Sequence, residues 1–189
     1  AASDVYKRQS LWKTHNLFLI GGDFEFPSLL EKQIIDFIYE YVNERAYLQG
    51  RIRFQASTSN LEIRALQKTL AKREIVQYPD IYVCSSLKEE FGISIIEAMS
   101  AGLVVLAPLL GGAKEYIRHG TNGFMINTAT SNSLGREFCS YVYNLQFSRE
   151  KINAIQKNAR ETISNMYSLD KIADEFVKVY KKIGVVNDK

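Results

Sequence analysis

The chain has few residues of the kinds that define several classes of protein. Its only cysteines, Cys84 and Cys139, lie far apart in sequence, and two thiols do not make a disulfide framework, which favours a reducing, cytoplasmic location. No apolar run approaches the length of a membrane-spanning helix, and no secretory signal is visible. The net charge of +3 and the lack of long Lys/Arg blocks argue against a nucleic-acid partner.

Residues that bind metals or act as nucleophiles are also scarce. The two histidines, His15 and His119, do not stand with a Ser or Cys in a nucleophile pattern. His119 lies in a Gly-rich stretch typical of a surface turn. No His/Cys/Asp/Glu group has the spacing of a ligand set, so we predict no metal and no cofactor.

The chain does not begin with Met, and residues 1–9 (AASDVYKRQ) show no periodicity. We interpret this segment as a translated adapter or cloning scar and exclude it from the fold. Residues 10–189 are assigned to one folded domain whose natural start we expect to be missing.

What the chain does contain is an ordinary globular composition, with 46% hydrophobic and 24% charged residues. Short apolar runs alternate with segments of helical periodicity, which predicts an α/β fold: a Rossmann-like parallel sheet with helices on both faces and a helical C-terminal tail. The expected strands are residues 16–20, 51–55, 81–84, 103–107 and 124–126. Ligands bind beyond the carboxyl ends of such strands, here the loops at residues 21–26, 56–60, 85–92 and 109–112.

Glu97 is the most informative residue in the stretch from Ser85 to Gly102 (SSLKEEFGISIIEAMSAG). Its neighbours predict a helix that is apolar nearly all round and therefore buried, ending at Gly102. A carboxylate fixed in such a helix needs hydrogen-bond donors, which sugar hydroxyls would supply. An interaction with the helix dipole, or a pair with a core Arg, would also account for Glu97 and stays open.

Gly92 stands where a loop becomes this helix. The first backbone N–H groups of a helix lack partners and attract anions, so a diphosphate could rest on Ile93 and Ser94. Gly92 lets a ligand come close, although a plain capping role would explain it as well. Eight positions along one helix would leave Glu89 and Glu97 roughly 80° apart, but with Glu89 in the loop both carboxylates can line one pocket.

The run Glu89-x-Phe91-Gly92-x4-Glu97-Ala98-Met99-x-Ala101-Gly102 resembles the signature of the group-one retaining glycosyltransferases with the GT-B fold. Further matches follow in the family's order: Val104 to Ala107, Gly111-Gly112-x-x-Glu115 and Gly120-x-x-Gly123-Phe124. The similarity extends from about Asn16 to Ile183.

This resemblance implies roles for individual residues. Glu89 would be the catalytic residue that holds hydroxyls of the donor sugar, and Glu97 would hold the ribose. Backbone groups of Phe91, Gly92 and Ile93 would contact the sugar, and those of Ile93 and Ser94 the diphosphate. The loop of Gln55, Ala56 and Ser57 would lie near the base.

The implied activity is transfer of a hexose from a nucleotide sugar to an acceptor with retention of anomeric configuration. The chain would be the donor-binding half, inactive alone, and its partner would be a missing N-terminal acceptor domain. Membrane association of the whole enzyme would depend on that other half, and the sugar, base and acceptor stay open.

Some positions depart from the family's pattern. Glu90 replaces a small residue or Pro, Ser85 stands where Pro is usual, and Ala56 where Gly is usual. The basic residues that grip the diphosphate in the family lie around an upstream strand that this chain lacks, and Arg51 and Arg53 stand on the wrong strand to replace them.

Other functions account for parts of this pattern. A nucleotide-sugar-binding module without transfer activity would keep the same residues. A sugar-nucleotide epimerase or an α-glucan phosphorylase would share the architecture, but the loop from Lys88 to Gly92 lacks the lysine context of a phosphorylase cofactor site. A pure interaction domain would leave the two carboxylates around a helix start unexplained.

Overall fold

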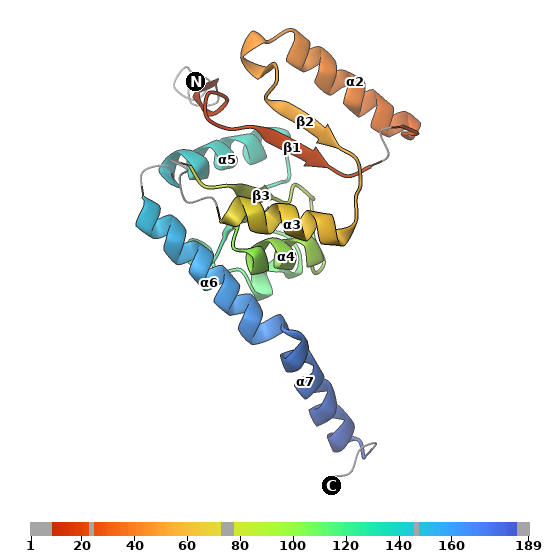
Figure 1. The fold of residues 1–189 in the computed structure, drawn as a ribbon, viewed down its shortest axis with the longest axis vertical. Coiled ribbons are helices and arrows are strands. Elements are labelled where there is room, and N and C mark those ends of the chain that lie inside the picture. The colour runs from red at the N-terminus through yellow and green to blue at the C-terminus, as the bar shows by residue number, and fades with distance from the viewer. Residues whose placement is uncertain (1–8, 23–24, 73–77, 146–147, 185–189) are drawn as a thin grey trace.

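Parallel strands covered by helices on both faces form the body of the molecule (Figure 1). This computed structural model describes residues 9–22, 25–72, 78–145 and 148–184, so the predicted adapter lies outside the described residues except for Gln9. The predicted fold class is confirmed. The strands are β1 (Leu17–Ile20), β2 (Ile52–Gln55), β3 (Ile81–Val83), β4 (Val104–Pro108) and β5 (Phe124–Ile126). The helices are α2 (Leu29–Asn43), α3 (Asn60–Ala71), α4 (Ile93–Ala101), α5 (Ser131–Leu145), α6 (Arg149–Tyr167) and α7 (Leu169–Lys182), with short 3-10 turns η1 (Ala46–Leu48) and η2 (Gly112–Glu115).

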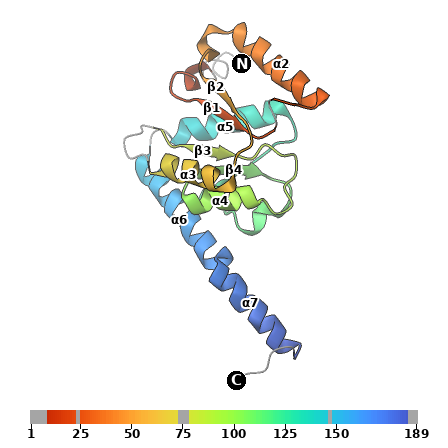
Figure 2. The same cartoon turned by 45° about the vertical axis from the view of Figure 1, so that its right-hand side comes forward.

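The strands are hydrogen-bonded in two groups rather than in one continuous sheet. β1 pairs in parallel with β2, and β3, β4 and β5 form a second parallel sheet in that order. β1 lies between β2 and β3 in both views (Figures 1 and 2). Its apolar side chains stay exposed, by 37% at Leu17, 47% at Phe18 and 42% at Ile20. Parallel strands are usually buried on both faces, so β1 is unusually exposed for such a strand.

The core is centred on β4, whose five residues are all buried. Val105 and Ala107 pack in one cluster with α4 and part of α6, while Val104 and Leu106 pack in another with α5. This alternation follows from the two-residue period of a strand. The buried face of α6 consists of Ile152, Ile155, Ala159 and Ile163, which recur at helical spacing.

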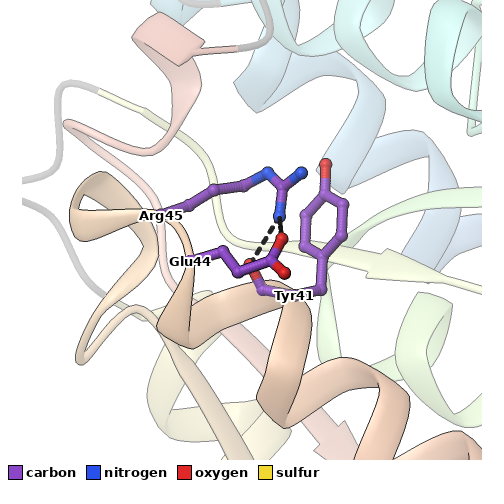
Figure 3. A network of polar contacts seen from close by, with 3 residues as sticks. All are labelled: Tyr41, Glu44 and Arg45. Carbon is purple, nitrogen blue, oxygen red and sulfur yellow. Dashed lines mark hydrogen bonds and ion pairs between the residues drawn. The ribbon is translucent and has the colours of Figure 1, made fainter.

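Helix α2 begins at a capping box, in which the Ser28 hydroxyl accepts from the Glu31 N–H and the Glu31 carboxylate accepts from the Ser28 N–H. At its other end the Arg45 guanidinium donates to the Tyr41 carbonyl (2.9 Å) and the Glu44 carboxylate (3.0 Å) and lies 3.6 Å from the Tyr41 ring centre (Figure 3). The helix buries no residue. Local capping therefore fixes its ends, while tertiary packing contributes little.

Helix α7 extends away from the body in both views (Figures 1 and 2) and also buries no residue. Exposed apolar side chains recur along α7 up to its C-cap, and we call them the α7 stripe: Leu169, Ile172, Phe176, Val179, Tyr180 and Ile183. A helix with one apolar face normally covers it. No helix in the described part of the chain has the length and apolar character to cross a bilayer.

The difference between α6 and α7 predicts different costs for the same truncation. Ile155→Ala, at a side chain 1% exposed, is expected to lower the free energy of unfolding by about 2–5 kcal/mol because it leaves a cavity. Ile183→Ala, at a side chain 63% exposed, should change it by less than about 0.5 kcal/mol. Urea denaturation of both variants measures this, and equal losses would show that the α7 stripe is covered in solution.

Candidate functional site

Helix α4 begins and ends at the predicted residues. Gly92 is its N-cap with a left-handed φ of 78°, and Gly102 ends it with a φ of 91°. A Cβ atom at Gly92 would lie 2.7 Å from the Ile95 Cδ1 atom and 2.8 Å from the Tyr116 hydroxyl, so no larger residue fits without a shift. Among the described residues, the N–H groups of Ile93 and Ser94 have no hydrogen-bond acceptor. The start of α4 therefore presents open donors to a ligand.

The loop before α4 is held by backbone pairing to the loop after β4. The Gly112 N–H donates to the Glu89 carbonyl (2.8 Å), and the Glu89 N–H donates to the Leu110 carbonyl (3.1 Å). A Cβ atom at Gly111 would lie 1.9 Å from the Glu89 carbonyl oxygen, and one at Gly112 would lie 2.0 Å from that of Glu90. Only glycine permits this approach, which fixes Glu89 at the carboxyl ends of β3 and β4. We call this contact the Glu89–Gly111 clamp.

The Glu89 side chain turns back towards the end of β3. Its Oε2 atom accepts from the Ser86 hydroxyl (3.5 Å) and from the Cys84 thiol (3.8 Å). The contacts are long, so they orient the carboxylate without using up its capacity to accept hydrogen bonds. A half-buried carboxylate with open lone pairs can bind sugar hydroxyls.

Phe91 is held through its backbone and its ring. The Tyr116 hydroxyl donates to the Phe91 carbonyl at 2.6 Å, and the Phe91 ring packs edge-on against Tyr116 and Tyr167. Burial raises the pKa of Tyr116, and the nearby Tyr167 and Glu89 add to the shift. The phenol therefore remains a donor at neutral pH, and one lone pair of the Phe91 carbonyl is occupied.

Glu97 is half-buried rather than enclosed, so the expectation of a helix buried all round is wrong on one face. Ile95, Ala98 and Met99 are buried, but Ile93 is 67% exposed. Glu97 stands one turn beyond Ile93 on the same face, because residues four apart are neighbours on a helix. It thus needs no partner to offset burial and faces outward beside the open N–H groups.

Tyr82 of β3 is hydrogen-bonded to the first turn of α4. Its hydroxyl donates to the Ser94 hydroxyl at 2.9 Å. Burial raises the pKa of Tyr82; the Ser94 hydrogen bond lowers it, and the charges of Cys84, Glu89 and Glu97 raise it. The hydrogen bond between Tyr82 and Ser94 thus joins β3 to the first turn of α4. The roles of Glu89, Glu97 and Ser94 in binding stay predictions.

The predicted base-proximal loop is tied to the loop after β1. The Gly21 N–H donates to the Gln55 carbonyl (3.1 Å), and the Ser57 N–H donates to the Gly22 carbonyl (3.2 Å). Gln55, Ala56 and Ser57 are exposed. No described backbone hydrogen bond joins them to α4, and their place near the base stays a prediction.

The basic residues near these loops have other contacts. The Arg51 guanidinium donates to the Asn16 side chain (3.3 Å) at the start of the strands, and that of Arg53 lies 5.9 Å from the Phe18 ring centre. Lys88 pairs with Glu90 at 2.6 Å. That Arg51 and Arg53 do not reach a diphosphate stays a prediction.

Two open hollows mark the surface. One adjoins the clamp and is lined by Lys88, Glu90, Leu110, Gly111, Gly112, Lys114 and Glu115. The other lies between α2 and β2 and is lined in part by Pro27, Tyr39 and Phe54. Neither hollow is lined by Glu89 or Glu97, and the second one lies beside the start of α2. The described residues contain no group of three side chains suited to a metal ion.

Sequence reasoning missed what Gly111, Gly112, Tyr82, Tyr116 and His119 do. A Gly-Gly pair directly after a buried strand is a signal of close backbone approach that could have indicated the clamp. The two tyrosines carry no such signal, because their partners are distant in sequence. His119 is exposed, as predicted for a turn, yet its Nδ1 atom accepts from the Met125 N–H (3.1 Å) and its Nε2 atom lies 3.2 Å from the Tyr141 hydroxyl.

The pattern that defines the family described as glycosyl transferases group 1 matches residues 45–162. This is more than half of the chain, and the chain belongs to that family. A sucrose synthase of Denitrovibrio acetiphilus is 28% identical over 181 residues, which cover 92% of this chain and 22% of that protein. An uncharacterized glycosyltransferase of Methanocaldococcus jannaschii is 32% identical over 109 residues, 58% of this chain and 27% of that protein.

Solved structures show the same architecture. HepE of Anabaena, crystallised in complex with UDP, matches 93% of this chain and 44% of its own with a TM-score of 0.72 and 22% identity. The C-terminal domain of a group 1 glycosyl transferase from Francisella tularensis matches 88% of this chain and 80% of its own with a TM-score of 0.67 and 19% identity. The fold is thus that of the C-terminal, Rossmann-like domain of GT-B glycosyltransferases, and the chain spans less than half of the HepE chain.

The clamp predicts that a methyl group at Gly111 is costly. Gly111→Ala is expected to lower the free energy of unfolding by roughly 2–5 kcal/mol, because left-handed strain adds to overpacking against the Glu89 carbonyl. Gly120→Ala is the matched control: its φ is also positive, at 76°, but a Cβ atom there meets nothing within 4 Å. It should cost only about 1–2 kcal/mol. Thermal or urea unfolding compares the two, and equal costs would contradict the clamp.

Proposed function

We propose that this chain is the donor-binding half of a hexosyltransferase that takes its hexose from a nucleotide sugar and retains the anomeric configuration. One observation carries the proposal: the start of α4 has open N–H donors, with the half-buried carboxylate of Glu89 in the loop before it and that of Glu97 one turn into the helix. A nucleotide sugar presents the matching groups, an anionic diphosphate between two sets of neutral hydroxyls.

The charges of the proposed complex are complementary. The diphosphate would lie at the N-terminus of α4, where the helix dipole and the N–H groups of Ile93 and Ser94 favour an anion. Glu89 would accept from hydroxyls of the hexose and Glu97 from those of the ribose. Backbone groups at Gly92, where a Cβ atom would obstruct the approach, would border the sugar.

The chemistry in this proposal is a displacement on one face of the sugar. The bond from the anomeric carbon to the acceptor oxygen forms as the bond to the leaving phosphate oxygen breaks, and the leaving diphosphate takes the acceptor's proton. The chain's residues position the donor and stabilise the charge that builds up on the diphosphate. Glu89 would act by holding the sugar and not as a nucleophile.

The acceptor would be bound by a second domain. The similar proteins are longer, since this chain spans 22% of the sucrose synthase and 44% of the HepE chain. The exposed apolar stripe of α7 and the exposed side chains of α2 leave surface for such a domain. Closure of two halves over the donor would exclude water, so we expect this chain alone to bind the donor and to transfer little.

Titration calorimetry with UDP, GDP and ADP and their glucose and mannose conjugates tests donor binding. We expect one nucleotide to bind, and Glu97→Ala to weaken it by about 10-fold or more, because hydrogen bonds to a charged acceptor are each worth about 1.5–3 kcal/mol.

Glu161→Ala is the matched control, because Glu161 is an exposed glutamate on α6 that pairs only with Lys157 in the described contacts. It should bind the nucleotide as the wild type does. Equal affinities for wild type and Glu97→Ala, or no binding of any nucleotide at millimolar concentration, would contradict the proposal.

A further inference from the structure

Tyr82 is a residue of β3 to which the resemblance gives no role. As the middle residue of a three-residue strand it faces opposite to its neighbours: Ile81 and Val83 pack on the α5 side, while Tyr82 packs with the cluster that contains α4. Its hydroxyl donates to the Ser94 hydroxyl across this contact, at 2.9 Å. The strand is thereby linked by a side-chain hydrogen bond to the first turn of α4.

This hydrogen bond determines what the Ser94 hydroxyl can still do. A serine hydroxyl has one proton to donate and two lone pairs. Because Tyr82 donates to one lone pair, the Ser94 proton must point away from Tyr82. No acceptor for that proton is present in the described part of the chain, and Ser94 is exposed. The residue thus has two open donors on the same side of α4, its hydroxyl and its backbone N–H.

We propose that Tyr82 is a positioning residue for the donor diphosphate: by donating to Ser94 it fixes the serine hydroxyl as a donor to a phosphate oxygen. This inference rests on the proposed function. Tyr82 itself cannot donate to the ligand, because its only proton is used in the bond to Ser94.

The surroundings of Tyr82 keep it in the donating state. Burial and the charges near it raise the pKa of Tyr82, so the phenol is protonated throughout the neutral range. A deprotonated Tyr82 would instead accept the hydrogen bond from the Ser94 hydroxyl. That hydroxyl could then no longer donate to the ligand. The same carboxylates that would bind the two sugar rings, Glu89 and Glu97, thus also help to keep the phenol neutral.

A double-mutant cycle tests the coupling. The ligand is whichever of UDP, GDP or ADP the chain binds, and the readout is the dissociation constant from calorimetry. Tyr82→Phe is expected to weaken binding about 3- to 10-fold, which is the scale of one hydrogen bond. Ser94→Ala should weaken it at least as much, and the double variant should bind no worse than Ser94→Ala alone.

Two further variants separate positioning from a merely structural role. Ser94→Thr keeps the hydroxyl and is expected to bind like the wild type. Tyr180→Phe, at an exposed tyrosine on α7, should have no effect. The free nucleoside, titrated by NMR at millimolar concentration, should bind wild type and Tyr82→Phe equally, because it has no phosphate to meet Ser94. Circular dichroism checks that each variant is folded.

The outcomes are distinct. No binding of any nucleoside diphosphate to the wild type would overturn the proposed function and this inference with it. Normal binding by Tyr82→Phe, or a double variant whose loss is the product of the two single losses, would overturn the positioning role and leave the proposed function standing. If Ser94→Thr fails to bind the nucleotide, the loss of binding in Ser94→Ala is due to altered packing at α4 and not to the missing hydroxyl. That result would also overturn the positioning role of Tyr82.

Discussion

The backbone pairing between Glu89 and the Gly111-Gly112 turn determines where every other group of the site lies. Its two hydrogen bonds, 2.8 and 3.1 Å long, join the loop after β3 to the loop after β4. Each is worth only about 1 kcal/mol net, so their importance is geometric. They fix the point at which the chain turns into α4, and with it the direction in which the N–H groups of Ile93 and Ser94 open. An added Cβ at Gly111 would occupy the space of the Glu89 carbonyl, so glycine is as necessary at position 111 as it is at position 92.

The site also stands on the best-packed part of the molecule. β4 is buried over its whole length and carries clusters on both faces, while α2 and α7 bury no residue at all. A binding site needs first contacts that are held by rigid neighbours. Here the Tyr116 hydroxyl holds the Phe91 carbonyl at 2.6 Å and Tyr82 holds Ser94, so residues from three loops and a strand converge on the start of one short helix.

Local sequence signals predicted the strands and helices well, because each depends on a nearby pattern. The helix from Ile93 to Ala101 with its cap at Gly102 follows from periodicity and glycine chemistry alone. The sequence could not show that β1 and β3 are not paired with each other. Strand pairing depends on contacts between segments far apart in sequence, and the candidate strands are similarly apolar. The exposure of Ile93 could not be predicted, because the composition of a helix does not show which of its faces the rest of the protein covers. Tyr82 and Ser94 are 12 residues apart, and no spacing rule links a strand residue to a helix residue.

The central claim, that the start of α4 is the diphosphate site, is tested most directly by NMR titration of the ¹⁵N-labelled chain with UDP-, GDP- and ADP-sugars. The account predicts that one of them shifts the backbone amide signals of Gly92, Ile93 and Ser94 most strongly, with smaller changes at Glu89 and Gly112 transmitted through the clamp. Shifts concentrated around Tyr39 and Phe54, in the hollow between α2 and β2, with the α4 amides unchanged, would contradict it. The absence of any shift at millimolar concentration would contradict it as well.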